Sequence, residues 1–233
     1  MKPLKLKTLC IIPFRGPIQC KTRLKINNST IDVVDQLVKS LFLEAYRLLT
    51  PFFTKTIILT KEKSLIQNWF VIKKPQICED ISCTLNGSLE EIIKSEADKF
   101  DYLTIVLPDL PLLVSQDVAY LLDSLSSKKY SAIIGRSKDN GTNMFSISSK
   151  IVPNITLNFG INSFYYHSQQ FKSEELLTVQ DGWTFDLDTP QDVSYLVNNT
   201  LLFNRLPPLI QKLTYEYIGF LSPIPPFKSP TTN

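Results

Sequence analysis

The sequence predicts an α/β fold: a single Rossmann-like domain with a mostly parallel central sheet flanked by helices. Three observations favour this class. Residues 102–107 form a short, nearly unbroken apolar run rich in β-branched side chains, which is typical of a strand buried on both faces. Short apolar runs of this kind are separated by segments with helical periodicity. A length of 233 residues suits one large domain with a full core.

Composition indicates an ordinary soluble globular protein, with 43% hydrophobic and 20% charged residues. The formal net charge of +3 is too small to indicate a nucleic-acid partner. No run reaches the roughly 18 apolar residues that a transmembrane helix needs. The four cysteines lack metal-ligand spacing and His167 is the single histidine, so neither a zinc site nor a disulfide framework is expected. We therefore expect a cytoplasmic protein with no nucleic-acid and no membrane partner.

The first expected strand is Thr8–Phe14, and a basic loop follows it over residues 15–25. Gly16 and Lys21 give the loop a partial likeness to a P-loop. The second glycine is absent, the spacing is one residue short and Pro17 removes an N–H, so we reject that motif. The loop either neutralises a polyphosphate or is merely solvated. Its four cations are Arg15, Lys21, Arg23 and Lys25.

A long helix is expected next, because apolar residues recur at helical spacing from the Asn27–Thr30 cap to about Leu49. Pro51 ends it. Thr56–Thr60 and Trp69–Ile72 are then predicted as strands. A further helix opens at residues 86–88 and leads to the central strand.

Asp109 follows the central strand directly, after Pro108 has ended the ladder. Open α/β sheets bind their ligands at the carboxyl ends of their strands, so this position favours a functional carboxylate. The alternative is that Asp109 only begins the turn before the next helix, which Ser115 caps and which runs to about Leu125.

Two further features follow. Tyr130–Ile134 is an expected strand, and Thr142–Ser148 alternates as a half-exposed strand does. A helix is expected to begin within Phe159–Phe164, where small residues and free N–H groups favour an anion site. A plain helix cap at Ser163 explains the same residues equally well.

Trp183–Asp188 is the last predicted strand, and alternation puts Asp186 and Asp188 on the same face of it. Two carboxylates two residues apart near a strand end suit a hard divalent cation, although they also fit two solvated acids before a helix. Six prolines after residue 205 predict an irregular or loosely packed tail. The expected organisation is a domain over 1–205 and a Pro-rich C-terminal extension over 206–233.

Taken in order, these motifs resemble the 2-phospho-L-lactate guanylyltransferase family of coenzyme F-420 biosynthesis. This family lies within the nucleotidyltransferases of the GT-A and molybdenum-cofactor-guanylyltransferase type, which have the nucleotide-diphospho-sugar transferase fold. The matching pieces span residues 11 to about 196 and are Ile11-Ile-Pro-Phe-Arg15, Lys21-Thr-Arg-Leu24, Asp80 with Leu85-Asn86, Leu107-Pro-Asp-Leu-Pro-Leu112, Gly141-Thr-Asn143, Phe159-Gly160 with Ser163-Phe164 and His167, and Asp186-x-Asp188-Thr-Pro190.

The resemblance implies that GMP is joined from GTP to a small phosphorylated carboxylic acid, with release of pyrophosphate. The acceptors implied are 2-phospho-L-lactate, phosphoenolpyruvate or 3-phosphoglycerate. A homodimer is left open. The residues carried over are Asp109, Asp186 and Asp188 for Mg²⁺; Lys21 and Arg23 against the triphosphate; Pro13, Phe14, Arg15, Asp80, Asn86 and Pro108 for the nucleotide; and Thr142, Gly160 and Ser163 for the acceptor phosphate.

The residue types suit this chemistry. A phosphate nucleophile with a second pKa near 6 is already ionised at neutral pH, so a chain with one histidine needs no imidazole base. Two like charges 4 Å apart repel by roughly 4 kcal/mol at an effective dielectric near 20, which Mg²⁺ and the basic loop would offset. Asn162 departs from the family, where glycine or serine is commoner, and this puts the acceptor's identity in doubt. The alternatives are a glycosyltransferase of the same fold and a non-catalytic nucleotide-binding protein.

Overall fold

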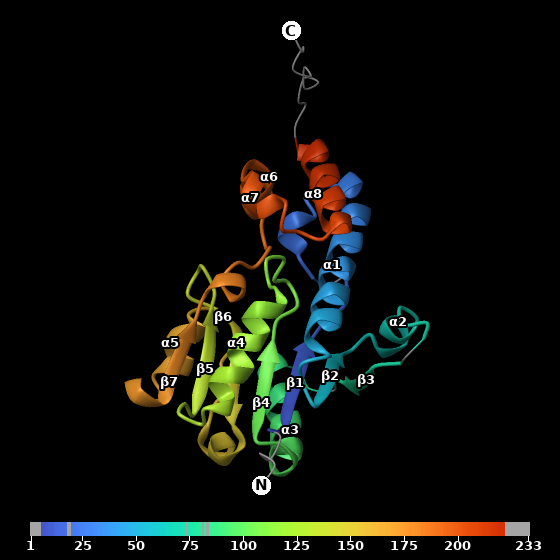
Figure 1. The fold of residues 1–233 in the computed structure, drawn as a ribbon. Coiled ribbons are helices and arrows are strands. Elements are labelled where there is room, and N and C mark those ends of the chain that lie inside the picture. The colour runs from blue at the N-terminus through green and yellow to red at the C-terminus, as the bar shows by residue number, and fades with distance from the viewer. Residues whose placement is uncertain (1–5, 18–19, 73, 81, 83, 222–233) are drawn as a thin grey trace.

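A computed structural model describes residues 6–17, 20–72, 74–80, 82 and 84–221. Its centre is a seven-stranded sheet in the order β3-β2-β1-β4-β6-β5-β7 (Figure 1). Within the described residues, β6 alone runs antiparallel to its neighbours, so the mostly parallel α/β architecture is confirmed. The strands are β1 (Thr8–Pro13), β2 (Lys55–Thr60), β3 (Gln76–Glu79), β4 (Tyr102–Val106), β5 (Ala132–Arg136), β6 (Thr142–Ser148) and β7 (Leu176–Val179).

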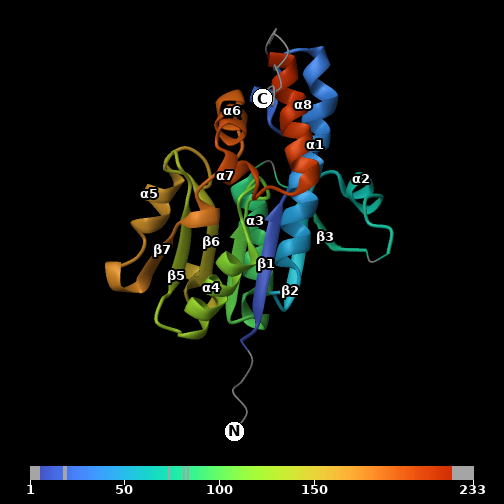
Figure 2. The ribbon, with the colours of Figure 1, turned by 45° about the horizontal axis from the view of Figure 1, so that its top comes forward.

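Helices cover both faces of this sheet (Figures 1 and 2). They are α1 (Asn28–Leu49), α2 (Lys63–Gln67), α3 (Leu85–Glu96), α4 (Ser115–Ser126), α5 (Ser163–Ser168), α6 (Pro190–Asn198), α7 (Thr200–Phe203) and α8 (Pro208–Leu221). Alternate side chains of β1 enter different core clusters, as a two-sided strand requires. Cys10 and Ile12 pack with α1, α4, α6 and α8, whereas Leu9 and Ile11 pack with α3.

The long first helix is confirmed, and its start is fixed by the predicted cap. The Asn27 side chain accepts the main-chain N–H of Thr30 at 3.0 Å, and the Thr30 hydroxyl accepts the N–H of Asn27 at 3.3 Å. The apolar stripe, including Val34, Leu37 and Leu41, is buried. This helix follows the basic loop and holds the loop's far end against the core.

Two predicted strands are wrong. Residues 69–72 form turns and bends, with Ile72 fully exposed, and the strand lies further on at β3. The aromatic residue at position 69 is explained by packing rather than by a strand: the ring of Trp69 lies edge-on against Phe42, with 6.0 Å between ring centroids. Residues 183–188 form no strand: Trp183 ends a 3-10 helix, Thr184 lies in a turn, and residues 185–188 belong to no helix or strand. The edge strand is the earlier β7. The apolar residues that suggested a strand at 183–188 include Trp183 and Leu187. Their side chains enter the core although the backbone pairs with no strand.

Three smaller predictions also need correction. The strand predicted at 130–134 begins two residues later, as β5. β6 is almost wholly buried rather than half-exposed, because it lies between β4 and β5 and its polar Ser146 bonds to Thr104 at 2.8 Å. Ser115 is the first residue of α4 rather than its cap, and the Asp117 carboxylate accepts the N–H of Val114 at 3.0 Å.

The expectation of an irregular tail is wrong for residues 208–221, which form α8; residues 222–233 lie outside the described part. α8 packs alongside α1 (Figures 1 and 2). Its Ile210, Leu213 and Tyr217 are buried, and the Tyr217 hydroxyl donates to the carbonyl of Leu24 at 2.9 Å. The helix therefore belongs to the packed core and supports the basic loop. The division of the chain at residue 206 stays a prediction.

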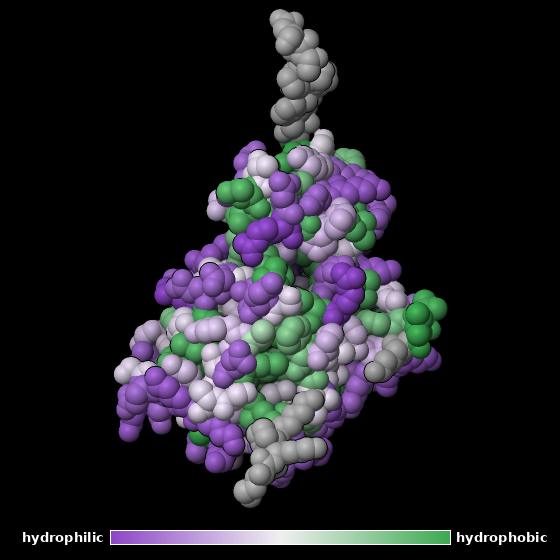
Figure 3. All heavy atoms as spheres, viewed as in Figure 1, coloured by the Kyte–Doolittle hydropathy of each residue, from purple (hydrophilic) through white to green (hydrophobic). Residues whose placement is uncertain are grey.

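Hydrophilic and hydrophobic side chains are interspersed over the face drawn in Figure 3. In the part of the chain that the structure describes, no helix is both long enough and apolar enough to cross a membrane.

Candidate active site

A pocket of about 610 Å³ lies at the carboxyl ends of the parallel strands, where the position of Asp109 predicts a site. A larger cavity of about 880 Å³ lies near the start of β1, but its lining includes no carboxylate. Predicted site residues lining the 610 Å³ pocket are Arg15, Arg23, Asn86, Thr142, Gly160, Ser163, Asp186 and Asp188. The structure therefore brings donor-site and acceptor-site candidates to one pocket.

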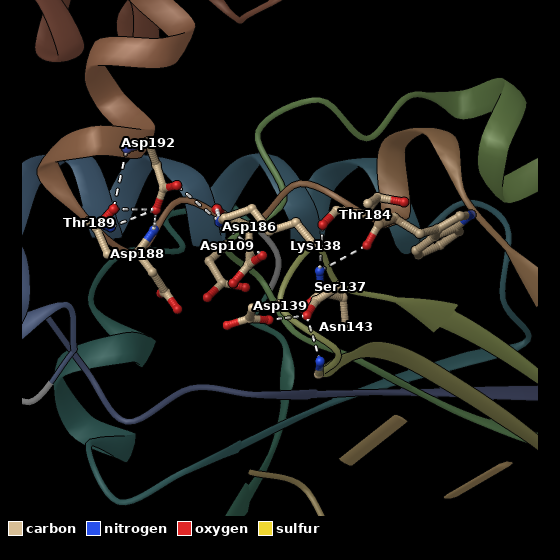
Figure 4. A network of polar contacts seen from close by, with 12 residues as sticks. Asp109, Ser137, Lys138, Asp139, Asn143, Thr184, Asp186, Asp188, Thr189 and Asp192 are labelled. Carbon is tan, nitrogen blue, oxygen red and sulfur yellow. Dashed lines mark hydrogen bonds and ion pairs between the residues drawn. The ribbon is translucent and has the colours of Figure 1, made fainter. Parts of the chain in front are cut away.

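The three predicted acids come together from two segments of the chain. Asp109 stands after β4, and its carbonyl accepts the N–H of Leu187 at 3.0 Å, so the segment 184–188 runs beside it. The Asn143 side chain ties the same segment to β6 by donating to the carbonyl of Trp183 at 2.9 Å. Figure 4 shows the carboxylates of Asp109, Asp186 and Asp188 turned toward the same region. These main-chain contacts replace the strand pairing predicted for the segment.

The Lys21 ammonium lies between two of these acids, in contact with the carboxylates of both Asp109 and Asp188. Burial disfavours the lysine's charged form, but the two carboxylates outweigh burial and raise the pKa of Lys21 above its ordinary value. Burial likewise disfavours the charged form of Asp188, but Lys21 outweighs it and lowers the pKa of that carboxyl. Lys21 and Asp188 are thus both held charged at neutral pH.

A second lysine holds the third acid. The Lys138 ammonium is 3.2 Å from a carboxylate oxygen of Asp186 and 3.1 Å from one of Asp192, and it also donates to the carbonyl of Asp186. Burial raises the pKa of Asp186 to about 6, with the nearby Asp109 and Asp188 acting in the same direction and Lys138 opposing them. Asp186 therefore takes up a proton more readily than Asp188.

The donor set fits a hard cation chemically. Carboxylate oxygens are the ligands that Mg²⁺ prefers, and Asp109 Oδ1 is buried with no hydrogen-bond partner in the described structure. Among the described residues, no group of three or more His, Cys, Asp or Glu side chains is arranged to hold a metal ion. With Lys21 in contact with Asp109 and Asp188, and Lys138 with Asp186, ammonium groups neutralise the acids. The Mg²⁺ site stays a prediction.

The acceptor-site candidates meet where β6 begins and α5 begins. Thr142 opens β6, and Ser163 is the first residue of α5, one position after its cap. The plain Ser cap is therefore wrong, because Asn162 takes that position. Asn162 has a positive φ of 56°, a conformation that asparagine tolerates better than most residues. Gly160 has a φ of 138° and open space beside it, so the backbone there is accessible to a ligand.

The nucleotide-site candidates divide into two groups. Arg15 and Arg23 line the pocket and are exposed, so both are available to a ligand. Asn86 also lines it, but its amide is engaged at both ends by the main chain of Phe159, donating at 3.2 Å and accepting at 2.8 Å. Asp80 accepts from the hydroxyl of Ser88. These contacts give Asn86 and Asp80 structural partners.

The remaining candidates do not line the pocket. Pro13 is the buried last residue of β1, and Pro108 ends the central ladder. The ring of Phe14 is in the core, stacked on Phe42 with 4.3 Å between centroids. The roles assigned to these three from the family resemblance stay predictions.

Several polar residues of the site had no predicted role. Lys138 and Asn143 anchor the 184–192 segment. Ser137 and Asp139 hold the turn before β6, where the Ser137 hydroxyl accepts the N–H of Gly141 at 2.8 Å. Asp192 accepts the main-chain N–H groups of Asp188 and Thr189 at 2.9 and 2.7 Å. The capping pattern Thr189-x-x-Asp192 was a readable signal for this last residue, whereas nothing local marks Lys138.

The fold is an α/β fold of the nucleotide-diphospho-sugar transferase type. A protein from Desulfovibrio desulfuricans G20, assigned to the nucleotide-diphospho-sugar transferases, has a TM-score of 0.74 at 17% identity, covering 92% of this chain and 96% of that one. The 4-diphosphocytidyl-2C-methyl-D-erythritol synthase of Anaerococcus prevotii DSM 20548 has a TM-score of 0.52 at 13% identity, covering 82% and 96%. At these identities the likeness is one of fold.

The family model described as "Guanylyl transferase CofC like" matches residues 8–199, and the chain belongs to this family. It is also similar to the 2-phospho-L-lactate guanylyltransferase of Methanothermobacter thermautotrophicus, at 25% identity over 195 residues, 82% of this chain and 85% of that protein. The family predicted from the motifs is confirmed, and the chain is an enzyme, a guanylyltransferase of this type.

Proposed function

We propose that this enzyme transfers GMP from GTP to a small phosphorylated carboxylic acid and releases pyrophosphate, as a step of coenzyme F-420 biosynthesis in the cytoplasm. The acceptor is 2-phospho-L-lactate, phosphoenolpyruvate or 3-phosphoglycerate. One observation carries the proposal: a single pocket joins a charged region to a region with hydroxyl groups. Arg15, Arg23, Asp186 and Asp188 line the charged region, and Thr142 and Ser163 line the other. A reaction between a triphosphate and a separate phosphate needs both regions in one space.

The two arginines account for recognition of the triphosphate. Both are exposed and line the pocket, and guanidinium groups bind phosphate oxygens with charge-assisted hydrogen bonds. They would stabilise the negative charge that develops on the leaving pyrophosphate. Lys21 would have a second part beside the predicted one against the triphosphate. Because its ammonium contacts Asp109 and Asp188, it fixes those carboxylates as well as adding positive charge to the site.

Asp109, Asp186 and Asp188 would hold Mg²⁺. When bound, the ion supplies positive charge that screens the two anionic substrates from each other. The unpartnered buried oxygen of Asp109 supports this assignment. Lys138 and Asn143 keep the segment that carries the other two acids in place.

The acceptor phosphate is the nucleophile. One of its oxygens forms a bond to the α-phosphorus of GTP, while the bond from that phosphorus to the bridging oxygen of the β-phosphate breaks. No proton has to be removed first, since the second pKa of a phosphate monoester is near 6. Thr142 and Ser163 would hold this group, and its orientation relative to GTP provides much of the rate.

The test is a pyrophosphate-release assay in which each of the four NTPs is paired with each of the three acids. We expect release with GTP and one or more of these acids, and a guanylylated acid as product. A glycosyltransferase would instead consume an intact sugar nucleotide and release no pyrophosphate from GTP. Absence of turnover in every pairing, from protein that binds GTP, would favour the non-catalytic alternative.

A further inference from the structure

The single histidine of the chain lies against the proposed acceptor site. His167 is on α5 and is fully buried. Its imidazole stacks on Phe145, with 4.6 Å between ring centroids, and meets Phe159 edge-on at 5.0 Å. Both ring nitrogens have polar partners in this apolar setting: Nε2 is 2.9 Å from the main-chain nitrogen of Asn158, and Nδ1 is 3.0 Å from Oγ1 of Thr142.

These two contacts determine where the imidazole carries its proton. A main-chain N–H can only donate, so Nε2 accepts from Asn158 and has no hydrogen. The proton of the neutral ring is then on Nδ1, which must donate to the Thr142 hydroxyl oxygen. Burial lowers the pKa of His167 to about 4, so the ring stays neutral near pH 7.

The hydroxyl of Thr142 is thereby restricted to one role. It accepts from Nδ1–H, so its own hydrogen cannot point back to the ring. Across the described residues, this side chain makes no second hydrogen bond that would use the hydrogen, and Thr142 lines the pocket together with Ser163. The hydrogen is left for a ligand in that pocket.

We infer that His167 is a positioning residue, whose Nδ1–H holds the Thr142 hydroxyl as a hydrogen-bond donor to an anionic oxygen of the acceptor's phosphate. The inference rests on the proposed function in taking that phosphate as the ligand. A hydroxyl committed to donating complements ionised phosphate, whose oxygens only accept. Accepting from an imidazole also polarises the hydroxyl and strengthens the bond that it donates.

Two substitutions separate the two hydrogen bonds of the ring. In His167→Gln, the side-chain oxygen can take the place of Nε2 and accept from Asn158, while the donor to Thr142 is lost. In His167→Asn, the amide nitrogen can take the place of Nδ1 and donate to Thr142, while the acceptor for Asn158 is lost. We expect His167→Gln to raise the acceptor KM by about 10-fold and to leave the KM for GTP unchanged. We expect His167→Asn to keep the acceptor KM near that of wild type, even where its Tm falls.

If His167 is purely structural, the two variants do not differ in this way. Either the acceptor KM rises in both variants in proportion to their loss of Tm, or it is unchanged in both, and each of these two results would overturn the inference. Since the chain has one histidine, ¹⁵N NMR of the imidazole gives an independent readout without turnover. The Nδ1–H tautomer is expected near pH 7, and the Nε2–H tautomer would overturn the inference.

A double-mutant cycle distinguishes failure of this inference from failure of the proposed function. Thr142→Val should raise the acceptor KM by about 10- to 100-fold, and adding His167→Gln should then have little further effect. If Thr142→Val leaves the acceptor KM unchanged, the acceptor site itself is misassigned. If Thr142→Val raises it but His167→Gln does not, the acceptor site stands and His167 is not its positioning residue.

Discussion

At the scale of single residues, the central feature is a set of carboxylates paired with two lysines. Lys21 pairs with Asp109 and Asp188, and Lys138 pairs with Asp186. Replacing one partner of such a pair leaves the other charge less well compensated. Substitutions that keep the shape of the side chain confine the change to charge, so lost activity can be separated from lost packing.

Asp109→Asn is expected to lower turnover by at least ~100-fold, because it removes a negative charge from the proposed Mg²⁺ site. Circular dichroism should show the wild-type fold, since the amide fills the same space. Asp123→Asn, on the exposed side of α4, is the matched control and should keep wild-type turnover. Wild-type turnover in Asp109→Asn, or full activity in excess chelator, would contradict the role in Mg²⁺ binding.

Arg23→Ala should raise the KM for GTP by roughly 10-fold and leave the acceptor KM near its wild-type value, because a charge-assisted hydrogen bond to phosphate is lost. Arg47→Ala is a control of the same charge, since Arg47 is exposed on α1 and pairs with Glu44. Steady-state titration of GTP at saturating acceptor gives the measurement. An equal KM for GTP in Arg23→Ala and Arg47→Ala would mean that Arg23 is only a solvated surface residue.

The buried imidazole predicts a particular dependence of stability on pH. The pKa of His167 is lowered to about 4 by burial, whereas an unfolded histidine titrates near 6.5. The unfolded state therefore binds more protons between these values, and stability is fully present above about pH 6.5 and is lost as the pH falls toward 4. The loss should be roughly 2 kcal/mol between pH 7 and pH 5. Urea unfolding of wild type and His167→Asn at both pH values tests this. The free energy of unfolding should fall more between pH 7 and pH 5 in wild type, because His167→Asn lacks the titrating histidine.

At the scale of elements, three segments position the site from outside the sheet. The segment 184–192 is fixed by the capping box of α6 and by Lys138, so its acids are held without strand pairing. η5 (Asp181–Trp183) lies close against the start of α4: a Cβ on Gly182 would come within 2.8 Å of the Leu113 Cα. The C-terminal helix α8 supports the basic loop through Tyr217.

Leu213→Ala should destabilise the protein by about 2–5 kcal/mol, because this side chain of α8 is buried and its removal leaves a cavity. Leu209→Ala is the control on the same helix: Leu209 is 55% exposed, and its loss should cost about 0.5 kcal/mol or less. The free energy of unfolding from urea titration gives both numbers. Similar small values would show that α8 is not part of the cooperative core.

At the scale of the whole molecule, the parallel strands β1 and β4 end at the same edge of the sheet, and the segments that follow them carry the charged half of the site. The antiparallel β6 starts at that edge and contributes Thr142. A ligand bound there contacts segments from most of the chain and stabilises the folded domain as a unit.

GTP should therefore raise the Tm of the whole domain. At about 100 times its Kd, a ligand adds roughly 2.7 kcal/mol, which corresponds to a shift of roughly 5–10 °C for a chain of this size. Differential scanning fluorimetry with GTP, and with ATP at the same concentration and ionic strength, makes the comparison. Equal shifts for both nucleotides would contradict guanine selection.

The sequence by itself determined the architecture and the candidate residues. Periodicity and caps locate elements such as α1, β4 and the start of α6, because these depend on local patterns of burial and on side-chain bonds within a few residues. Asp109 was identified from its position after a buried strand, and Asp186 and Asp188 from their spacing. The order of the motifs identified the family.

The tertiary structure decided how those residues are used. That Lys21 meets Asp109 and Asp188, that Lys138 meets Asp186, and that His167 meets Thr142 depend on contacts across 25 to 167 positions of sequence. No local pattern encodes such distances. The aromatic and apolar residues at 69–72 and 183–188 likewise fit a strand and a packed loop equally well. Only the available neighbours determine whether a backbone pairs in a ladder or its side chains simply enter the core.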